Sequence, residues 1–239
     1  MSEAISVKGL TKSYHGKTVL NHLDLSVKTG TVFGLLGANG AGKSTTMECM
    51  LESRKADSGE VLLLDRNPKR NRRELFQQIG VQFQEGNCQQ EIKAYELCEE
   101  TACLYRNPAD WKELCGKFGI GDKLDCTVKS LSGGERQRLF IVLALIPNPK
   151  LVFLDELTTG LDAKARRGVW RILEELKEQG LTIFLTSHFM DEVEALCDEI
   201  CILKEGNAVF RGTVKEAKER CGCDRFEDAY LMLSEEESI

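Results

Sequence analysis

The chain has 239 residues, with 38 acidic and 32 basic side chains and a formal net charge of −6. Its hydrophobic content of 42% and charged content of 29% are those of an ordinary globular protein, which excludes a disordered chain. The longest apolar run, Leu139–Ile146, is far shorter than the roughly 20 residues of a membrane-spanning helix. Met1–Ala4 lacks the pattern of a secretory signal, and the acidic balance disfavours nucleic acid as a partner. We therefore expect a cytoplasmic protein without a membrane span of its own.

The ten cysteines of the chain raise the question of disulfide bonds or a metal site. No two of them have the spacing C-x-x-C, and three histidines are too few to complete a typical zinc site. A chain of this length buries a core without cross-links, so we expect reduced thiols. Cys221 and Cys223, separated by one glycine, are the pair for which we would look for oxidation.

The N-terminal quarter of the chain alternates polar and apolar residues. Residues 5–8, 18–20 and 23–27 predict short strands of an antiparallel layer, which leads into a first core strand over 31–36. A helix over 43–53 and a strand over 61–64 follow. The next connection is polar and rich in basic residues, which we interpret as a solvated surface. Its basic residues are Arg66, Lys69, Arg70, Arg72 and Arg73.

The middle of the chain, residues 87–129, has no convincing strand pattern. Its apolar residues recur at helical spacing, which predicts a helical insertion. Strands and helices then alternate, as they do around a mostly parallel sheet that is covered on both faces. The predicted elements are a helix ending at Ile146, strands over 151–154 and 181–185, helices over 165–179 and 190–196, and strands over 200–203 and 208–210. The predicted fold class is α/β.

A phosphate-binding loop is predicted at Gly37–Ser44, which fits the pattern G-x-x-x-x-G-K-[ST] between a strand and a helix. Glycines allow the backbone N–H groups to converge on phosphate oxygens, and the helix that begins here adds its own unpaired N–H groups. Lys43 would reach the β- and γ-phosphates, and the Ser44 hydroxyl would coordinate Mg²⁺. We expect nucleotide binding.

Two later strands end in residues that suit the chemistry of a nucleotide. The strand over 151–154 is followed by Asp155 and Glu156, and the strand over 181–185 leads to His188. Since parallel strands deliver their carboxyl ends to one edge of a sheet, these residues should meet Lys43 there. Asp155 would lie beside the metal ion, Glu156 would orient or deprotonate a water molecule, and His188 would contact the γ-phosphate.

A second helix start with exposed N–H groups is predicted at Ser132–Glu135, where Ser132 can cap the helix and two glycines follow. The octapeptide Leu131–Arg138 resembles the signature motif of ABC-type ATPases, and the resemblance covers roughly residues 4–235. It implies an α/β P-loop NTPase with a mostly parallel central sheet, a short N-terminal antiparallel β layer and a helical subdomain insertion. The implied divisions of the single domain are a RecA-like core over 1–86 and 147–220, a helical subdomain over 87–146 and a C-terminal tail over 221–239.

The resemblance also implies roles for individual residues and a pairing of cassettes. Gln84 would touch Mg²⁺ together with Ser44 and Asp155, would sense a membrane partner, and would act in catalysis with Lys43, Glu156 and His188. Two cassettes would pack head to tail as a homodimer, each ATP lying between the phosphate loop of one chain and Ser132–Glu135 of the other. The residues implied to contact ATP are Tyr14, Gly37, Asn39, Gly40, Ala41, Gly42, Lys43, Ser44, Thr45, Ser132, Gly133, Gly134, Glu135 and Asp162.

Three further segments (Thr45–Met47, Thr182–Glu192 and Phe226–Leu233) resemble cassettes of bacterial ABC-2-type exporters. The resemblance therefore implies an ATP hydrolase that lies at the inner face of the cell membrane and drives export through a separate transmembrane permease. Leu157 departs from the family, which usually has proline there, and this substitution would loosen the turn toward Asp162. Two alternatives stay open: a soluble ABC ATPase of translation or DNA repair, and a regulatory cassette that binds nucleotide without hydrolysing it.

Overall fold

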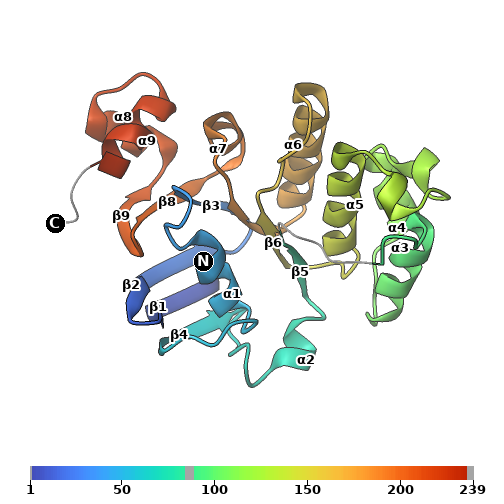
Figure 1. Ribbon diagram of the computed structural model, residues 1–239, viewed down its shortest axis with the longest axis horizontal. Helices are drawn as coiled ribbons and strands as arrows, with labels where there is room; N and C mark the ends of the chain where they lie inside the picture. The colour runs from blue at the N-terminus through green and yellow to red at the C-terminus, as the bar shows by residue number, and fades with distance from the viewer. Residues whose placement is uncertain (1, 84–88, 236–239) are drawn as a thin grey trace.

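The computed structural model describes residues 2–83 and 89–235, which form two sheets and a set of covering helices (Figure 1). The first sheet is antiparallel and has the order β2-β1-β4, with β1 at Glu3–Tyr14, β2 at Lys17–Lys28 and β4 at Ser58–Leu63. The sequence predicts two short strands within the range of β2. The structure has one long strand, because the polar break at residue 22 is a bulge with a φ of 48° and a shift in register.

The second sheet of the described chain has six strands in the order β5-β6-β7-β3-β8-β9, and all neighbouring pairs are parallel except β8 and β9. Strand β5 was not among the predicted elements, since it has four residues and one of them is a glycine. The predicted core strands are otherwise confirmed. Their bounds are β3 Val32–Gly37, β5 Ile79–Gln82, β6 Leu151–Asp155, β7 Thr182–Thr186, β8 Glu199–Lys204 and β9 Asn207–Gly212.

Helices cover both faces of the parallel sheet. The predicted helical insertion is confirmed, since α3, α4 and α5 form a lobe beside β5 and β6 (Figure 1). The bounds are α1 Lys43–Met50, α2 Arg72–Leu75, α3 Ala94–Cys103, α4 Trp111–Lys117, α5 Gly133–Leu145, α6 Ala163–Glu178, α7 Met190–Leu196, α8 Val214–Cys221 and α9 Phe226–Glu235, with 3₁₀ turns at Gly121–Lys123 and Val128–Ser130. None of the helices in the described parts of the chain is long and apolar enough to cross a bilayer.

Three clusters of buried side chains hold these layers together. One lies between the antiparallel sheet, α1 and one face of the parallel sheet, and it includes Met47 and Phe184. The second joins the opposite face of the sheet to α3–α6, and the third packs α7–α9 on β8 and β9. The helical lobe and the central sheet therefore share one core, which fixes the start of α5 relative to the strand ends.

The nine described cysteines are free thiols, and Cys88 lies outside the described residues. Several are deeply buried, and burial raises the pKa of Cys49 to about 11 and that of Cys201 to about 12. A thiol with such a pKa stays protonated at neutral pH and behaves as a small apolar side chain.

Candidate functional site

The predicted phosphate loop joins the end of β3 to the start of α1, and its shape depends on two glycines. Gly37 has a φ of 150°, and a Cβ atom there would lie 2.5 Å from the carbonyl oxygen of Leu203. Gly42 has a φ of 109°, and a Cβ atom there would lie 2.8 Å from Leu20 Cδ2. The packing of β8 and β2 against the loop leaves no room for larger residues. The loop is therefore held in its shape before any ligand arrives.

The N-terminus of α1 is suited to an anion. Among the described residues, no side chain caps this helix start, and its first turn has no acidic residue. The Lys43 ammonium donates hydrogen bonds to the carbonyl oxygens of Gly37 at 2.8 Å and Ala38 at 3.1 Å, so it lies against the loop. Burial lowers the pKa of Lys43, an effect that the charges of Glu156 and Asp155 oppose. A buried ammonium and uncapped N–H groups together favour phosphate.

A cleft of about 480 Å³ opens over this loop. Its volume is in the range of small-molecule sites. Tyr14, from the end of β1, lies on its wall with Lys12 and Arg54 packed near the ring, at 5.2 and 5.4 Å from the ring centre. The structure therefore brings Tyr14 to the predicted loop and to Glu156. The lining residues are Tyr14, Val19, Asn39, Gly40, Gly42, Lys43, Ser44, Thr45 and Glu156.

Asp155 ends β6 beside the phosphate loop, as predicted. It is 4% exposed, and it accepts hydrogen bonds from the hydroxyls of Thr186 and Ser44. Burial and the neighbouring charge of Glu156 raise the pKa of Asp155, although the bonds from Thr186 and Ser44 oppose this rise. A buried carboxyl group next to a second, partly exposed carboxyl group would be stabilised by a divalent cation. The oxygen donors of Asp155 and Ser44 therefore fit Mg²⁺, which prefers such ligands.

Glu156 has an unusual backbone conformation, with a φ of 50°. Its N–H donates to Thr186 Oγ1 at 3.0 Å, and its carboxylate accepts from Thr159 Oγ1 at 3.3 Å. Nδ1 of His188 lies 3.9 Å from Glu156 Oε1. A left-handed conformation at a residue other than glycine costs free energy, and such strain is found at functional sites. The structure thus brings Glu156 and His188 together at the carboxyl ends of β6 and β7.

The second predicted anion site, the start of α5, is not part of this cleft, whose described lining contains none of residues 132–135. Ser132 caps the helix, since its hydroxyl accepts from Glu135 N at 3.2 Å. Glu135 accepts in turn from Ser132 N at 2.9 Å and Ser132 Oγ at 2.8 Å. The bond from the Ser132 N–H is the main cause of a lowered Glu135 pKa. Gly133 and Gly134 start the helix.

Asp162 also lies outside the cleft, as far as the described lining shows, and caps α6 by accepting from the N–H groups of Lys164 and Ala165, both at 2.9 Å. The turn that leads to it is well held. Leu157 is fully buried, and its carbonyl oxygen accepts from Gln137 Nε2 at 2.8 Å. That leucine in place of proline loosens this turn stays a prediction. Gln84, the remaining predicted site residue, lies outside the described residues.

A buried polar cluster that no sequence pattern predicted surrounds Glu192. Glu192, fully buried in the first turn of α7, accepts hydrogen bonds from Thr158 Oγ1 at 2.6 Å and Trp170 Nε1 at 3.2 Å. Burial raises the pKa of Glu192. The cluster ties the helix after His188 to the turn after Glu156. The only signal for it in the sequence was an acidic residue in an apolar helix pattern, which is too common to be specific.

Comparison with known proteins places the chain in a family. The family model described as "ABC transporter" matches residues 20–159, more than half of the chain. The chain belongs to the ABC transporter family. The resemblance drawn from the signature octapeptide is thereby confirmed. The phosphate loop, Ser132–Glu135, Asp155 and Glu156 lie within the matched residues, whereas Tyr14, Asp162 and His188 lie outside them.

Curated relatives include ATP-binding proteins that are named for Nod factor export and for drug resistance. The Nod factor export ATP-binding protein I of Ralstonia nicotianae is 37% identical over 226 residues, which are 92% of this chain and 70% of that protein. The daunorubicin/doxorubicin resistance ATP-binding protein DrrA of Streptomyces peucetius is 34% identical over 226 residues, 92% of this chain and 68% of that protein. A solved structure of the ATP-binding subunit of an ABC transporter has a TM-score of 0.89 at 25% identity and covers 97% of this chain and 100% of its own. The predicted fold is therefore confirmed as that of an ABC cassette.

Proposed function

We propose that the chain is the ATP-binding and ATP-hydrolysing subunit of an exporter and that it drives transport through a separate membrane subunit. The observation that carries this proposal is the meeting of the carboxyl ends of β3, β6 and β7. Lys43, Ser44 and Glu156 line one cleft there. Asp155 accepts a hydrogen bond from Ser44, and His188 lies 3.9 Å from Glu156. The role in export is supported by the relatives named Nod factor export ATP-binding protein I.

Binding of ATP would rest on the start of α1. The uncapped N–H groups and Lys43 would hold the phosphates, and Tyr14 would stack on the adenine from the opposite wall of the cleft. Ser44, Asp155 and Gln84 would hold Mg²⁺, which when bound neutralises negative charge on the phosphate oxygens. The buried position of Asp155 keeps its carboxylate directed at the Ser44 hydroxyl.

Hydrolysis would rest on Glu156 and His188. Thr186 fixes the backbone of Glu156, and Thr159 bonds to its carboxylate, so the carboxylate is held where it can accept a proton from an attacking water molecule. His188 would reach the γ-phosphate and hold it toward that water. The Glu192 cluster keeps α7, and with it His188, in register with the turn 157–162.

A second copy of the chain would complete the site. The start of α5 and Asp162 lie away from the described cleft lining, although the family resemblance assigns both to ATP contacts. A single chain thus has one phosphate cradle and one separate helix start. Head-to-tail pairing would place Ser132–Glu135 of each copy on the ATP of the other. We propose a homodimer on this ground.

The membrane subunit would dock on the face between the core and the helical lobe. An apolar groove of about 260 Å³ lies there, and its lining includes Phe76, Phe83, Tyr105 and Leu143. Phe83 is 38% exposed and directly precedes Gln84, the residue expected to sense the partner. A groove of this kind accepts an apolar side chain or a short helix from another protein. The chain would then lie at the inner face of the cell membrane.

The proposal is tested on the purified chain by calorimetry of ATP binding and by phosphate release, each with and without Mg²⁺. We expect binding and Mg²⁺-dependent turnover. Lys43→Ala should weaken ATP binding about 10- to 100-fold, because hydrogen bonds to charged groups contribute about 1.5–3 kcal/mol, whereas the exposed Lys150→Ala should not. Equal affinities of these two variants would contradict the assignment of the loop. Binding without turnover would favour the regulatory cassette instead.

A further inference from the structure

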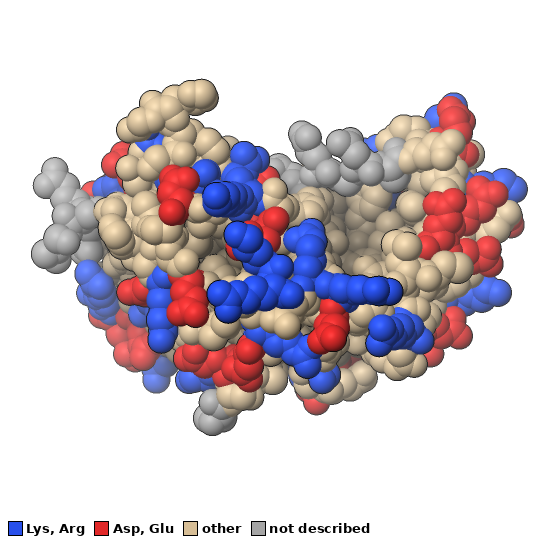
Figure 2. Space-filling view, turned by 90° about the horizontal axis from the view of Figure 1, so that it is seen from below, with Lys and Arg blue, Asp and Glu red and all other residues tan. Residues whose placement is uncertain are grey.

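A group of five exposed basic residues, here called the basic cluster, lies on α2 and the connection before it: Arg66, Lys69, Arg70, Arg72 and Arg73. The segment 65–74 also contains Asp65 and Glu74, so its net charge is 5 − 2 = +3, while the whole chain has −6. Figure 2 shows blue side chains gathered across the middle of the face seen from below, the side on which α2 lies in Figure 1. Positive charge is thus concentrated on one face of an acidic protein.

Most of this charge is not neutralised within the described chain. Arg66 pairs with Glu74 at 2.8 Å, and Arg72 donates to the carbonyl oxygen of Leu51 at 3.1 Å. Lys69, Arg70 and Arg73 have no acidic side chain within 4 Å among the described residues. Like charges that stand this close in the sequence repel one another, so the cluster would gain from an external anionic surface.

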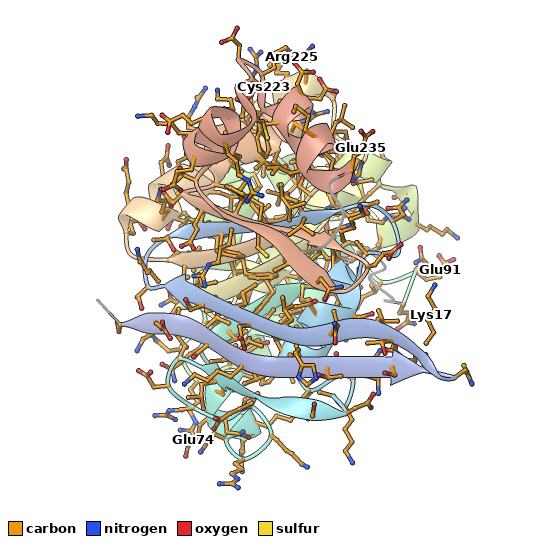
Figure 3. All side chains as sticks on the ribbon, turned by 90° about the vertical axis from the view of Figure 1, so that its left-hand side faces the viewer. Lys17, Glu74, Glu91, Cys223, Arg225 and Glu235 are labelled. Atoms are coloured by element: carbon orange, nitrogen blue, oxygen red, sulfur yellow. The ribbon has the colours of Figure 1, made fainter. Side chains whose placement is uncertain are left out.

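The basic cluster adjoins the apolar groove between the core and the helical lobe. Arg72 belongs to both: it lines the groove, and its guanidinium lies 4.6 Å from the ring centre of Phe76, another lining residue. Figure 3 shows Glu74, at the end of the basic segment, at the opposite end of the molecule from Cys223. A membrane subunit that inserts a segment into the groove would therefore bring the basic cluster toward the bilayer from which that segment emerges.

We propose that the basic cluster binds the anionic lipid headgroups of the membrane next to the docked permease. This inference rests on the proposed function, because the groove defines which face is turned to the membrane. Each exposed Lys or Arg near an anionic bilayer contributes about 1 kcal/mol, which strengthens binding about fivefold. Lys69, Arg70 and Arg73, which have no acidic partner in the described part of the chain, therefore supply roughly a hundredfold.

The chemistry of the segment favours a lipid surface over an acidic protein. A specific protein interface needs an apolar or aromatic core, whereas residues 65–74 are polar or charged apart from the buried Pro68. Binding to single-stranded nucleic acid uses aromatic side chains that stack on bases, and the segment has none. Lys69, Arg70 and Arg73 lie outside the described lining of the apolar groove. Flexible basic side chains of this kind fit a diffuse layer of phosphate headgroups.

The test is sedimentation of the full chain with vesicles of phosphatidylcholine, alone or mixed with phosphatidylglycerol. We expect binding to the mixed vesicles that falls as salt is added, since the attraction is electrostatic. The variant Lys69→Gln/Arg70→Gln/Arg73→Gln should bind them about a hundredfold more weakly. The matched control Arg167→Gln/Arg171→Gln/Lys215→Gln removes the same charge from exposed residues of α6 and α8, away from α2 in Figure 1, and should bind like the unaltered chain.

Three outcomes would overturn the inference. The first is equal binding of the chain to neutral and to mixed vesicles. The second is an equal loss of vesicle binding in both triple variants. The third is binding of polyglutamate or RNA through the basic cluster without binding of mixed vesicles. Calorimetry of ATP binding on the same samples separates this failure from that of the proposed function. Normal ATP affinity without vesicle binding would reject the lipid contact alone, and loss of ATP binding by the unaltered chain would reject the proposed function.

Discussion

The starts of α1 and α5 both have glycines that suit phosphate, before the helix at α1 and in its first turn at α5, yet the two starts are capped differently. The start of α1 has no side-chain cap among the described residues and carries the buried Lys43. The start of α5 is capped by Ser132, and Glu135 accepts two hydrogen bonds from the same serine. A cap satisfies N–H groups that would otherwise be open to an anion. The same kind of sequence signal thus produces one helix start without a side-chain cap and one whose Glu135 N–H is capped.

In the proposed homodimer, this difference would give the two helix starts different parts of each ATP site. An open, positively charged helix start binds phosphate by itself. A capped helix start with an acidic residue in its first turn gains less from an anion, and in the proposed homodimer its two glycines would contact the phosphate that the other copy holds. Variants that act on one start and leave the other intact can therefore test the comparison.

The largest effect is expected for Glu156→Gln, which removes the carboxylate beside the α1 start but keeps its shape. Turnover should fall at least about 100-fold, as it does when a general base is lost, while ATP binding to a single chain is retained. Phosphate release and calorimetry on the same sample measure both. The exposed Glu178→Gln serves as the matched control. Near-normal turnover of Glu156→Gln would mean that the chemistry lies elsewhere.

The placement of α5 depends on Gly80 in β5, because a Cβ atom there would lie 1.8 Å from the carbonyl oxygen of Ala144. We expect Gly80→Ala to lower the free energy of unfolding by about 1–3 kcal/mol through overpacking. Gly168→Ala in α6 has no neighbour within 4 Å and should instead raise it by about 0.5–1 kcal/mol. Urea unfolding followed by circular dichroism measures both, and similar effects of the two variants would contradict the packing of α5 on β5.

The cap of α5 is tested by Ser132→Ala. We expect turnover to fall about tenfold, because a bond to the phosphate of the partner is lost, and stability to fall by about 1 kcal/mol, because the helix loses its cap. The affinity of a single chain for ATP should not change. Thr213→Ala is the matched control, because the Thr213 hydroxyl caps α8 by accepting a hydrogen bond from the Glu216 N–H. This variant should be less stable, but its turnover should not change. A loss of single-chain affinity in Ser132→Ala would break the division between the two starts.

The smallest effect concerns Glu192, which ties α7 to the turn after Glu156. Burial raises its pKa in the folded chain above the ordinary value of 4.5. Its contribution to stability is therefore fully present below pH 4.5 and is lost as pH rises through the folded pKa. Glu192→Gln should remove this part of the pH dependence and change stability at low pH by less than about 1 kcal/mol. Urea unfolding at several pH values measures it, and an unchanged pH dependence would contradict the assignment.

The fold could be predicted in large part because its elements have strong local patterns. The apolar run before Asp155 and the alternation in the first 36 residues predicted strands that the structure confirms. Strand β5 escaped prediction because four residues carry too little periodicity, and it is a strand because β6 pairs with it. The polar residues around His22 suggested a turn between two strands, because polar residues occur at bulges and at turns alike. The structure has a bulge there within one strand.

The sequence by itself determined the phosphate loop, because a tight turn of N–H groups demands glycine at fixed spacing, followed by lysine and a hydroxyl. It also determined the family, through the octapeptide at residues 131–138. Only the tertiary structure decided that Tyr14 and Glu156 line one cleft with the loop and that Ser132 does not. It alone revealed the bond between Thr158 and Glu192, and the continuity of the basic cluster with the groove through Arg72. The reason is that these relations join residues far apart in the chain, and such contacts depend on how the layers pack rather than on any local pattern.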